Sequence, residues 1–223
     1  TIDVYKTPIG TNEDSVIDPV DLHPYGLNRY RLEKWVEENI SDHLIVRLPG
    51  LYGENIKKNF IFDLINVIPS MLSDSKYEEL LSRNNSISSF YIKQGNGFFR
   101  CKELTAKERK DLKEYFIESG FSALNFTDSR GIFQFYNLSY LWGHIETGLA
   151  KGVKKLNLAV EPVSASEVYD RIKGSSFVNE IAENPPKYDF RTKHAELFSG
   201  TNGYIFDKEF ILNDIKSFVN AKS

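Results

Sequence analysis

The sequence contains very little cysteine: Cys101 is the single one among 223 residues. One cysteine excludes an internal disulfide, so a reducing compartment, with the cytoplasm as the default, is expected. The four histidines are scattered and lack the spacing of metal ligands, so no metal site is predicted. No apolar run has the length of a membrane span. The formal net charge of −3 argues against nucleic acid or an anionic membrane as the main partner.

Short apolar runs alternate with helical patterns along the chain, which predicts an α/β protein with parallel strands. Strands are expected at residues 1–6, 44–48, 89–93, 131–138 and 156–160. Helices are expected at residues 23–41, 54–68, 105–119, 139–151, 164–173 and 210–219. The helices that begin near Thr105 and Ser164 each carry a glutamate three residues later, which is the pattern of a capping box.

The helix predicted at residues 23–41 carries the chemistry of greatest interest. Tyr25 and Arg29 are four residues apart, so the hydroxyl and the guanidinium can share one side of that helix. A phenol beside a fixed positive charge is the minimum equipment of a tyrosine acid/base catalyst. Alternatively, Tyr25 is only an aromatic residue at a helix start and Arg29 a solvated residue on the helix surface. Tyr30 and Lys34 have the same spacing, so they could form the pair instead. One helix face is apolar and is expected to be buried, through Leu32, Trp35, Val36 and Ile40.

Four segments, in chain order, resemble the extended short-chain dehydrogenase/reductase family, in its NAD-dependent epimerase/dehydratase group. The first, TIDVY, resembles the strand end S/T-x-x-V-Y, and the second, YGLNRYRLE, resembles the helix start YGxxKxxxE. The third, LIVRLPGLYG, is similar to the strand and turn R-x-x-x-V-Y-G. The fourth pairs GIFQFYNLSYLWGHIETGL with LNLAVEPVSASEVYDRI and resembles the late strand, helix, strand and helix of the family.

The resemblance implies roles for particular residues. Tyr25 would be the acid/base, Arg29 its electrostatic partner, and Thr1 the hydroxyl that orients the substrate. Pro49, Gly50 and Leu51 would lie along the nicotinamide face of a bound NAD or NADP, where Tyr25 and Arg29 would also contact the cofactor. The resemblance further implies an oxidoreductase, epimerase or dehydratase whose substrate is a nucleotide-sugar or a similar polar carbonyl or alcohol. The oligomeric state is left open, with a homodimer as one option.

The sequence departs from the family pattern at three points. Arg29 stands where the family has lysine, and the turn Gly50-Leu51-Tyr52-Gly53 lacks the usual asparagine. The glycine-rich dinucleotide loop is absent, since Gly95 and Gly97 lack the preceding strand and following helix that such a loop needs. The chain is therefore expected to be the C-terminal part of a longer protein, and alone to be inactive and unable to bind a dinucleotide tightly.

The family layout predicts how the chain divides into domains. Residues 1–53 and 131–151 are expected to form the C-terminal half of a partial Rossmann-like parallel sheet. Residues 54–130 and 152–223 are expected to form a smaller, intermixed α/β domain that binds substrate. Its basic segment could hold a phosphate or carboxylate through Arg191, Lys193 and His194, or it could be a solvated turn.

Two other classes of function remain open at this stage. One is a non-catalytic nucleotide-binding or regulatory protein that retains the dehydrogenase fold, which the substitution at Arg29 favours. The other is a carbohydrate-related interaction module without a nucleotide site. His144 and Trp142 are expected to be core residues, and Cys101 has no neighbourhood that would make it a nucleophile.

Overall fold

The computed structural model describes residues 1–222 and is a mixed α/β protein. It contains two compact units, one formed by residues 1–61 with the described part of 128–223, and the other by residues 62–127. This division differs from the expected one, because residues 152–222 belong with residues 1–61 and not with 62–127.

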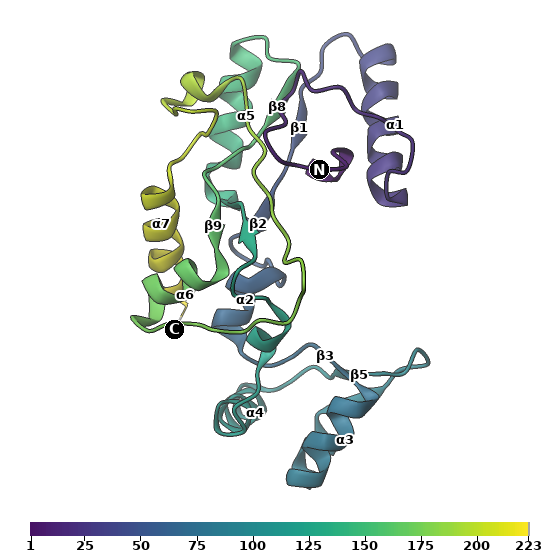
Figure 1. The fold of residues 1–223 in the computed structure, drawn as a ribbon, viewed down its shortest axis with the longest axis vertical. Helices are drawn as coiled ribbons and strands as arrows, with labels where there is room; N and C mark the ends of the chain where they lie inside the picture. Colours follow the sequence, from purple (N-terminus) through teal and green to yellow (C-terminus); the bar gives the residue numbers. More distant parts are fainter. Residues whose placement is uncertain (223) are drawn as a thin grey trace. The chain divides into compact units, whose positions relative to one another are not determined.

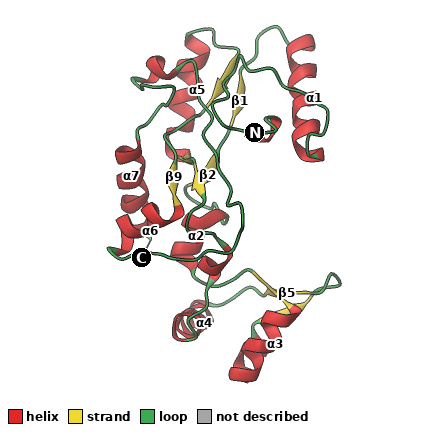
Figure 2. Ribbon diagram, in the orientation of Figure 1, coloured by secondary structure: helices red, strands yellow, loops and turns green. Residues whose placement is uncertain are grey.

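The first unit is built on three short pairs of strands. Strand β1 (Ile45–Arg47) is parallel to β8 (Lys155–Asn157), and β2 (Gly50–Tyr52) is parallel to β7 (Phe135–Asn137). Strand β6 (Ile132–Phe133) is antiparallel to β9 (Val163–Ser164). The expected parallel pairing is therefore present, as two separate pairs of three residues each. Figure 2 shows how short these strands are beside the loops that join them.

Helices cover the strand pairs of this unit, with α1 on one side of β1 and β8 and α5 on the other (Figure 1). Its helical elements are η1 (Ile2–Val4), α1 (Pro24–Asn39), η4 (Leu138–Tyr140), α5 (Leu141–Ala150), α6 (Ala165–Lys173), η5 (Ala195–Phe198) and α7 (Lys208–Asn220). The capping box predicted for α6 is confirmed, because the Ser164 hydroxyl accepts a hydrogen bond from the Glu167 amide and the Glu167 carboxylate accepts one from the Ser164 amide.

One predicted element is wrong, and another begins later than predicted. Residues 1–6 do not form a strand: they contain η1, which starts where the Thr1 hydroxyl accepts a hydrogen bond from the Asp3 amide. The helix expected from residue 54 begins at Asn59, as α2 (Asn59–Asn66), which crosses from the first unit into the second. The delay has a backbone cause, since Asn55 and the terminal residue Asn59 have φ angles of 63° and 66°, and a right-handed helix cannot continue through such a residue toward the N-terminus.

The apolar face of α1 is not buried as predicted. Leu32, Trp35 and Ile40 are 50%, 55% and 41% exposed, and Trp142 on α5 is also 66% exposed and not in the core. The residues of α1 that are buried are Gly26 and Glu33. The helix is oriented by a polar partner beneath it, so hydrophobic periodicity alone predicted the wrong face.

That partner is Arg47 of β1, whose side chain is fully buried. Its guanidinium donates to the Glu33 carboxylate at 3.1 and 2.6 Å, and to the Tyr5 hydroxyl at 2.6 Å. Burial opposes the positive charge, but Glu33 and Tyr5 outweigh it and hold the pKa of Arg47 above its usual value. The Tyr5 hydroxyl also accepts from the side-chain amide of Asn157 at 2.9 Å. This Arg47 network joins η1, α1, β1 and β8.

The C-terminal helix α7 is attached to the strands by a second polar cluster. The Asp214 carboxylate accepts hydrogen bonds from the Tyr52 hydroxyl, from the Asn137 amide at 2.8 Å and from the Tyr140 hydroxyl at 3.0 Å. Burial, together with the bond to Asp214, raises the pKa of Tyr52, so this phenol stays protonated. The cluster fixes the end of β2 and β7 against α7.

The second unit is an antiparallel sheet with two helices. Its strands β3 (Met71–Ser73), β4 (Tyr91–Lys93) and β5 (Phe98–Cys101) lie in the order β3-β5-β4. Its helical elements are α3 (Asp74–Arg83), η2 (Asn85–Ser89), α4 (Ala106–Glu118) and η3 (Ala123–Phe126). The predicted capping box of α4 is confirmed, with Thr105 and Glu108 as its two members. The core includes Leu72, Leu80, Leu112 and Phe116.

Helix α2 contains a partly buried carboxyl group, that of Asp63, which is expected to make the stability of the fold depend on pH. Burial raises the pKa of Asp63 from 3.8 to about 7, so the folded chain keeps a proton that the unfolded chain releases between these values. The free energy of unfolding therefore falls as the pH rises through that window. Asp63→Asn is expected to raise it by about 2 kcal/mol at about pH 8, a value reduced from the full shift because the group retains some solvent contact.

At about pH 4, where Asp63 is largely protonated in the folded chain, the same substitution is expected to have little effect. Urea denaturation of the wild type and the variant at both pH values measures the difference. An equal effect of the substitution at the two pH values would show that the pKa of Asp63 is not raised in the folded chain.

Candidate functional site

An open hollow of about 930 Å³ lies in the first unit, and we call it the Tyr25 hollow. Its walls come from η1, from the first turns of α1, from the segment that joins β1 to β2, and from the loop before α2. The lining residues are Thr1, Asp3, Tyr25, Arg29, Leu48, Pro49, Gly50, Leu51, Asn55, Ile56, Lys57, Lys58 and Asn59. The structure thus brings together the catalytic and nicotinamide-side residues predicted from the sequence.

Gly26 explains how Tyr25 comes to lie next to Thr1 and Asp3. A Cβ atom at Gly26 would lie 2.0 Å from the carbonyl oxygen of Asp3, so only glycine permits the first turn of α1 to approach η1 this closely. The start of α1 is fixed by His23, whose side chain accepts a hydrogen bond from the Tyr25 amide at 3.3 Å. The glycine of this Tyr-Gly pair is therefore required by packing as well as being part of the resemblance.

Arg29 and Tyr25 contact each other as their spacing predicts. The Cζ atom of Arg29 lies 5.1 Å from the centroid of the Tyr25 ring, so the guanidinium stacks over the ring face. Neither residue is buried, and Tyr25 is 47% exposed. The phenol is thus open to a ligand in the hollow, and a positive charge lies beside its ring.

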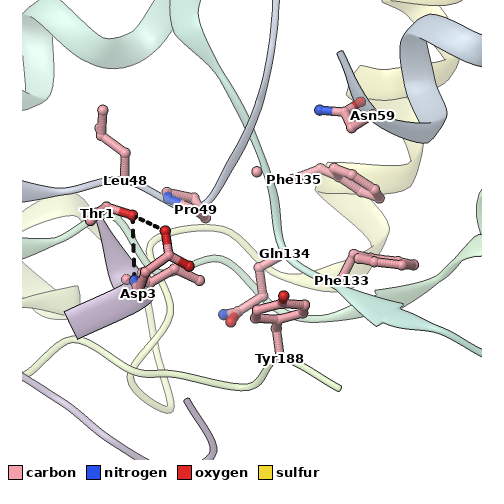
Figure 3. Close-up of a pocket in the computed structure, with 11 residues that line it drawn as sticks. Thr1, Asp3, Leu48, Pro49, Asn59, Phe133, Gln134, Phe135 and Tyr188 are labelled. Atoms are coloured by element: carbon pink, nitrogen blue, oxygen red, sulfur yellow. Dashed lines mark hydrogen bonds between the residues drawn. The ribbon is translucent and has the colours of Figure 1, made fainter. Parts of the chain in front are cut away.

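Thr1 and Asp3, which also line the Tyr25 hollow, are hydrogen-bonded to each other. The Thr1 hydroxyl donates to the Asp3 carboxylate at 2.6 Å, and the same hydroxyl oxygen accepts from the Asp3 amide (Figure 3). Because its single O–H donates to Asp3, this hydroxyl cannot at the same time donate to a substrate oxygen. It can donate to a ligand only after the bond to Asp3 is broken.

The segment Leu48–Leu51 is fixed to its surroundings through its backbone. The Leu48 carbonyl accepts from the Ile2 amide at 3.4 Å, the Gly50 amide donates to the Gln134 carbonyl at 3.1 Å, and the Leu51 carbonyl accepts from the Asn59 side chain at 2.7 Å. These bonds leave the side chains of the segment as an apolar, well-held wall.

An aromatic cavity of about 220 Å³ shares part of this wall. Phe133, Phe135 and Tyr188 line it, together with Thr1, Asp3, Pro49 and other residues of the Tyr25 hollow (Figure 3). The rings of Phe133 and Tyr188 are stacked with centroids 6.2 Å apart. Gln134 also lines the cavity, but its side-chain amide is occupied by the backbone of Val160 and Phe190. The cavity is therefore suited to a flat, weakly polar group.

The predicted substrate-side residues lie elsewhere. The Arg191 guanidinium is held by the Asp189 carboxylate at 3.1 Å and by the Asn202 carbonyl at 2.7 Å. Lys193 forms an ion pair with Asp14 at 2.5 Å, and Lys193 and His194 line a different hollow. These three residues are not among those that line the Tyr25 hollow.

Sequence reasoning missed several residues of the hollow. Asp3 was passed over because its segment was predicted as a strand, and the aromatic cavity joins residues that are distant in sequence. The lysine pair 57–58 was missed because these residues were predicted to belong to the helix 54–68, whereas they lie in the loop before it. A signal for the loop did exist, since Asn55 and Asn59 flank the lysines and asparagine tolerates a positive φ angle.

Neither a metal centre among residues 1–222 nor a matching known protein was found. Within residues 1–222, no group of three or more histidine, cysteine, aspartate or glutamate side chains is placed to hold a metal ion. No helix in the same range has both the length and the apolar character needed to span a bilayer. Comparisons with protein-family models, with curated proteins and with solved structures found no match.

Proposed function

We propose that the Tyr25 hollow is the proton-transfer side of an active site of the NAD(P)-dependent epimerase and dehydratase kind. Its substrate would be a nucleotide-sugar or a similar polar carbonyl or alcohol. The observation that supports this proposal is the convergence of Thr1, Tyr25, Arg29 and Pro49–Leu51 on one hollow. They come from three separate segments that each resemble a motif of the same family, and nothing in their spacing along the chain requires them to meet.

The residues of the hollow suit a nicotinamide ring and a polar substrate together. The segment Leu48–Leu51 offers an apolar wall of fixed backbone, and the adjoining aromatic cavity includes the rings of Phe133, Phe135 and Tyr188. The nicotinamide, when bound, would donate or accept a hydride. The residues of this chain would hold the substrate oxygen near the Tyr25 hydroxyl and move the proton that balances the hydride.

Tyr25 would transfer that proton, since it is the exposed hydroxyl with a cation beside it. Arg29 would favour negative charge at the phenol, although its planar guanidinium stacks over the ring and is not equivalent to a lysine ammonium. Asp3 would set which way the Thr1 hydroxyl donates, because its carboxylate accepts the hydrogen bond from that hydroxyl.

A second candidate function is ligand binding without chemistry. The observation that favours it is the internal use of two expected catalytic groups: the Thr1 hydroxyl donates to Asp3, and Arg29 stacks on the Tyr25 ring. Such a protein would bind a nucleotide or sugar nucleotide in the same hollow and would release it unchanged.

The two functions are separated by measuring binding and turnover on the complete natural protein. NADH fluorescence is titrated first, and a panel of nucleotide-sugars is then incubated with the protein and cofactor and followed by NMR of the sugar. The proposed activity predicts saturable quenching and conversion of at least one sugar. Quenching without conversion of any sugar would favour the binding protein, and failure of both would reject the nicotinamide-dependent site.

A further inference from the structure

We propose that the Tyr25 hollow contains a phosphate subsite formed by Lys57 and Lys58, with Arg29 contributing from α1. The ligand that reaches Tyr25 would therefore carry a phosphate group. This inference rests on the proposed function, because it describes the ligand of the same hollow. It concerns two residues for which neither the family resemblance nor the helical pattern predicts a role.

The charge of the hollow is the first argument. Arg29, Lys57 and Lys58 line it with a single carboxylate, that of Asp3, which gives a local excess of two positive charges. The chain as a whole has a formal net charge of −3. A concave surface of one sign concentrates the opposite sign, so this hollow attracts anions on a protein that otherwise repels them.

The three cations are also unpaired within the protein. Throughout residues 1–222, no ion pair joins Arg29, Lys57 or Lys58 to a carboxylate. Lys154, Lys155 and Lys193, which line a different hollow, are by contrast each paired with a carboxylate. The ammonium groups in the Tyr25 hollow are therefore free to bind an external anion.

The loop that carries the lysines is fixed at both ends. Gly53 has a φ angle of 152°, its carbonyl accepts from the Ile56 amide at 3.3 Å, and Glu54 is paired with Lys222. At the other end, the Asn59 side chain donates to the Leu51 carbonyl and accepts from the Ile61 amide. The positive φ angles of Asn55 and Asn59 turn the loop so that the segment between them lines the hollow.

The chemistry of these side chains favours phosphate. A lysine ammonium is a compact point charge with three donors and binds phosphate oxygens from several directions. Two adjacent lysines and one arginine can together balance a phosphate dianion. The positive end of α2, which begins at Asn59 on the wall of the hollow, adds to the same field.

The subsite is tested by calorimetric titration of the complete natural protein with inorganic phosphate. The expected result is saturable binding with a Kd of about 1 mM or tighter, weakened about 10-fold or more in the double variant Lys57→Gln/Lys58→Gln. The matched control is Lys107→Gln/Lys110→Gln, which removes two exposed, unpaired lysines from α4 and so changes the net charge equally.

Three results would overturn the subsite: no saturable binding of phosphate, an equal loss in the control variant, or binding of succinate as tight as that of phosphate. The source of the phosphate is assigned by NADH affinity in the Lys57→Gln/Lys58→Gln variant. A parallel loss supports a subsite for the phosphates of the dinucleotide, and an unchanged affinity supports a subsite for the phosphate of the second substrate.

This test is separable from that of the proposed function. If phosphate binding fails while sugar conversion proceeds, the active site stands and the subsite is wrong. If phosphate binds at the lysines while no sugar is converted, the subsite stands and the epimerase or dehydratase activity is wrong.

Discussion

Tyr25→Phe is expected to lower the turnover of the complete natural protein by about 10²–10⁴-fold while NADH affinity changes by less than about 2-fold. The substitution removes one hydroxyl and keeps the ring on which Arg29 stacks, so the shape and charge of the hollow are preserved. A positioned general acid or base contributes this range of rate, whereas cofactor affinity depends on other contacts. Steady-state kinetics on a converted sugar, with a parallel NADH titration, measures both quantities.

The matched control is Tyr30→Phe, on the same helix. Tyr30 has a lysine, Lys34, within 5.8 Å of its ring and thus the same i, i+4 arrangement as Tyr25 and Arg29. It does not line the Tyr25 hollow, so its loss is expected to leave turnover within about 2-fold of the wild type. Equal turnover in Tyr25→Phe and the wild type would reject Tyr25 as the acid/base, and a large loss in Tyr30→Phe alone would assign the role to the other tyrosine.

Glu33→Ala is expected to lower the free energy of unfolding by about 3–5 kcal/mol, which is a large part of the stability of a typical domain. The Arg47 guanidinium is fully buried and Glu33, itself only 8% exposed, is the one carboxylate among residues 1–222 that forms an ion pair with it. Removing the carboxylate leaves a buried positive charge with Tyr5 as its main remaining partner. Urea denaturation followed by circular dichroism measures the loss.

Two further variants separate this effect from loss of a helix residue. Glu38→Ala, at an exposed position of α1, is expected to change stability by less than about 0.5 kcal/mol. The double variant Glu33→Leu/Arg47→Met replaces both charges by apolar groups and is expected to be more stable than Glu33→Ala alone. A Glu33→Ala protein as stable as Glu38→Ala would show that the buried pair does not hold α1 in place.

The sequence predicted best those features that depend on a few neighbouring residues. The two capping boxes formed as expected, since each needs only a hydroxyl and a carboxylate three residues apart. Helix α1 was placed within two residues of its ends, and parallel strands were predicted from the order of elements, although which segments pair was not. Local hydrogen bonding and the order of elements can both be predicted from the sequence alone.

Features that depend on distant partners were not predictable in this way. The prediction of which face of α1 is buried was wrong, because Arg47 of β1 draws Glu33 toward the interior. The hydrophobic periodicity of α1 contains no information about a charged residue on β1. The strand expected at residues 1–6 was wrong: Thr1 caps the η1 turn there, and this turn packs against α1 at a distance that only Gly26 permits. Each error follows from one long-range contact that overrides a local preference.

The residues of the candidate site also fall into those that local sequence could predict and those that depend on distant contacts. Tyr25, Arg29, Thr1 and Pro49–Leu51 could be singled out because each lies in a segment that resembles a motif. Asp3 and the lysine pair 57–58 could not be singled out, since their relevance arises only when η1 and the loop before α2 meet α1. Arg191, Lys193 and His194 were selected on composition alone, and the structure holds two of them in ion pairs away from the hollow.

Backbone amide NMR of the complete natural protein, titrated with NADH, tests whether the Tyr25 hollow accepts the nicotinamide. We expect saturable chemical-shift changes at Tyr25, Arg29, Gly50 and Leu51, with little change at residues 71–118 of the second unit. Saturable NADH binding that leaves Tyr25, Arg29, Gly50 and Leu51 unshifted would contradict it.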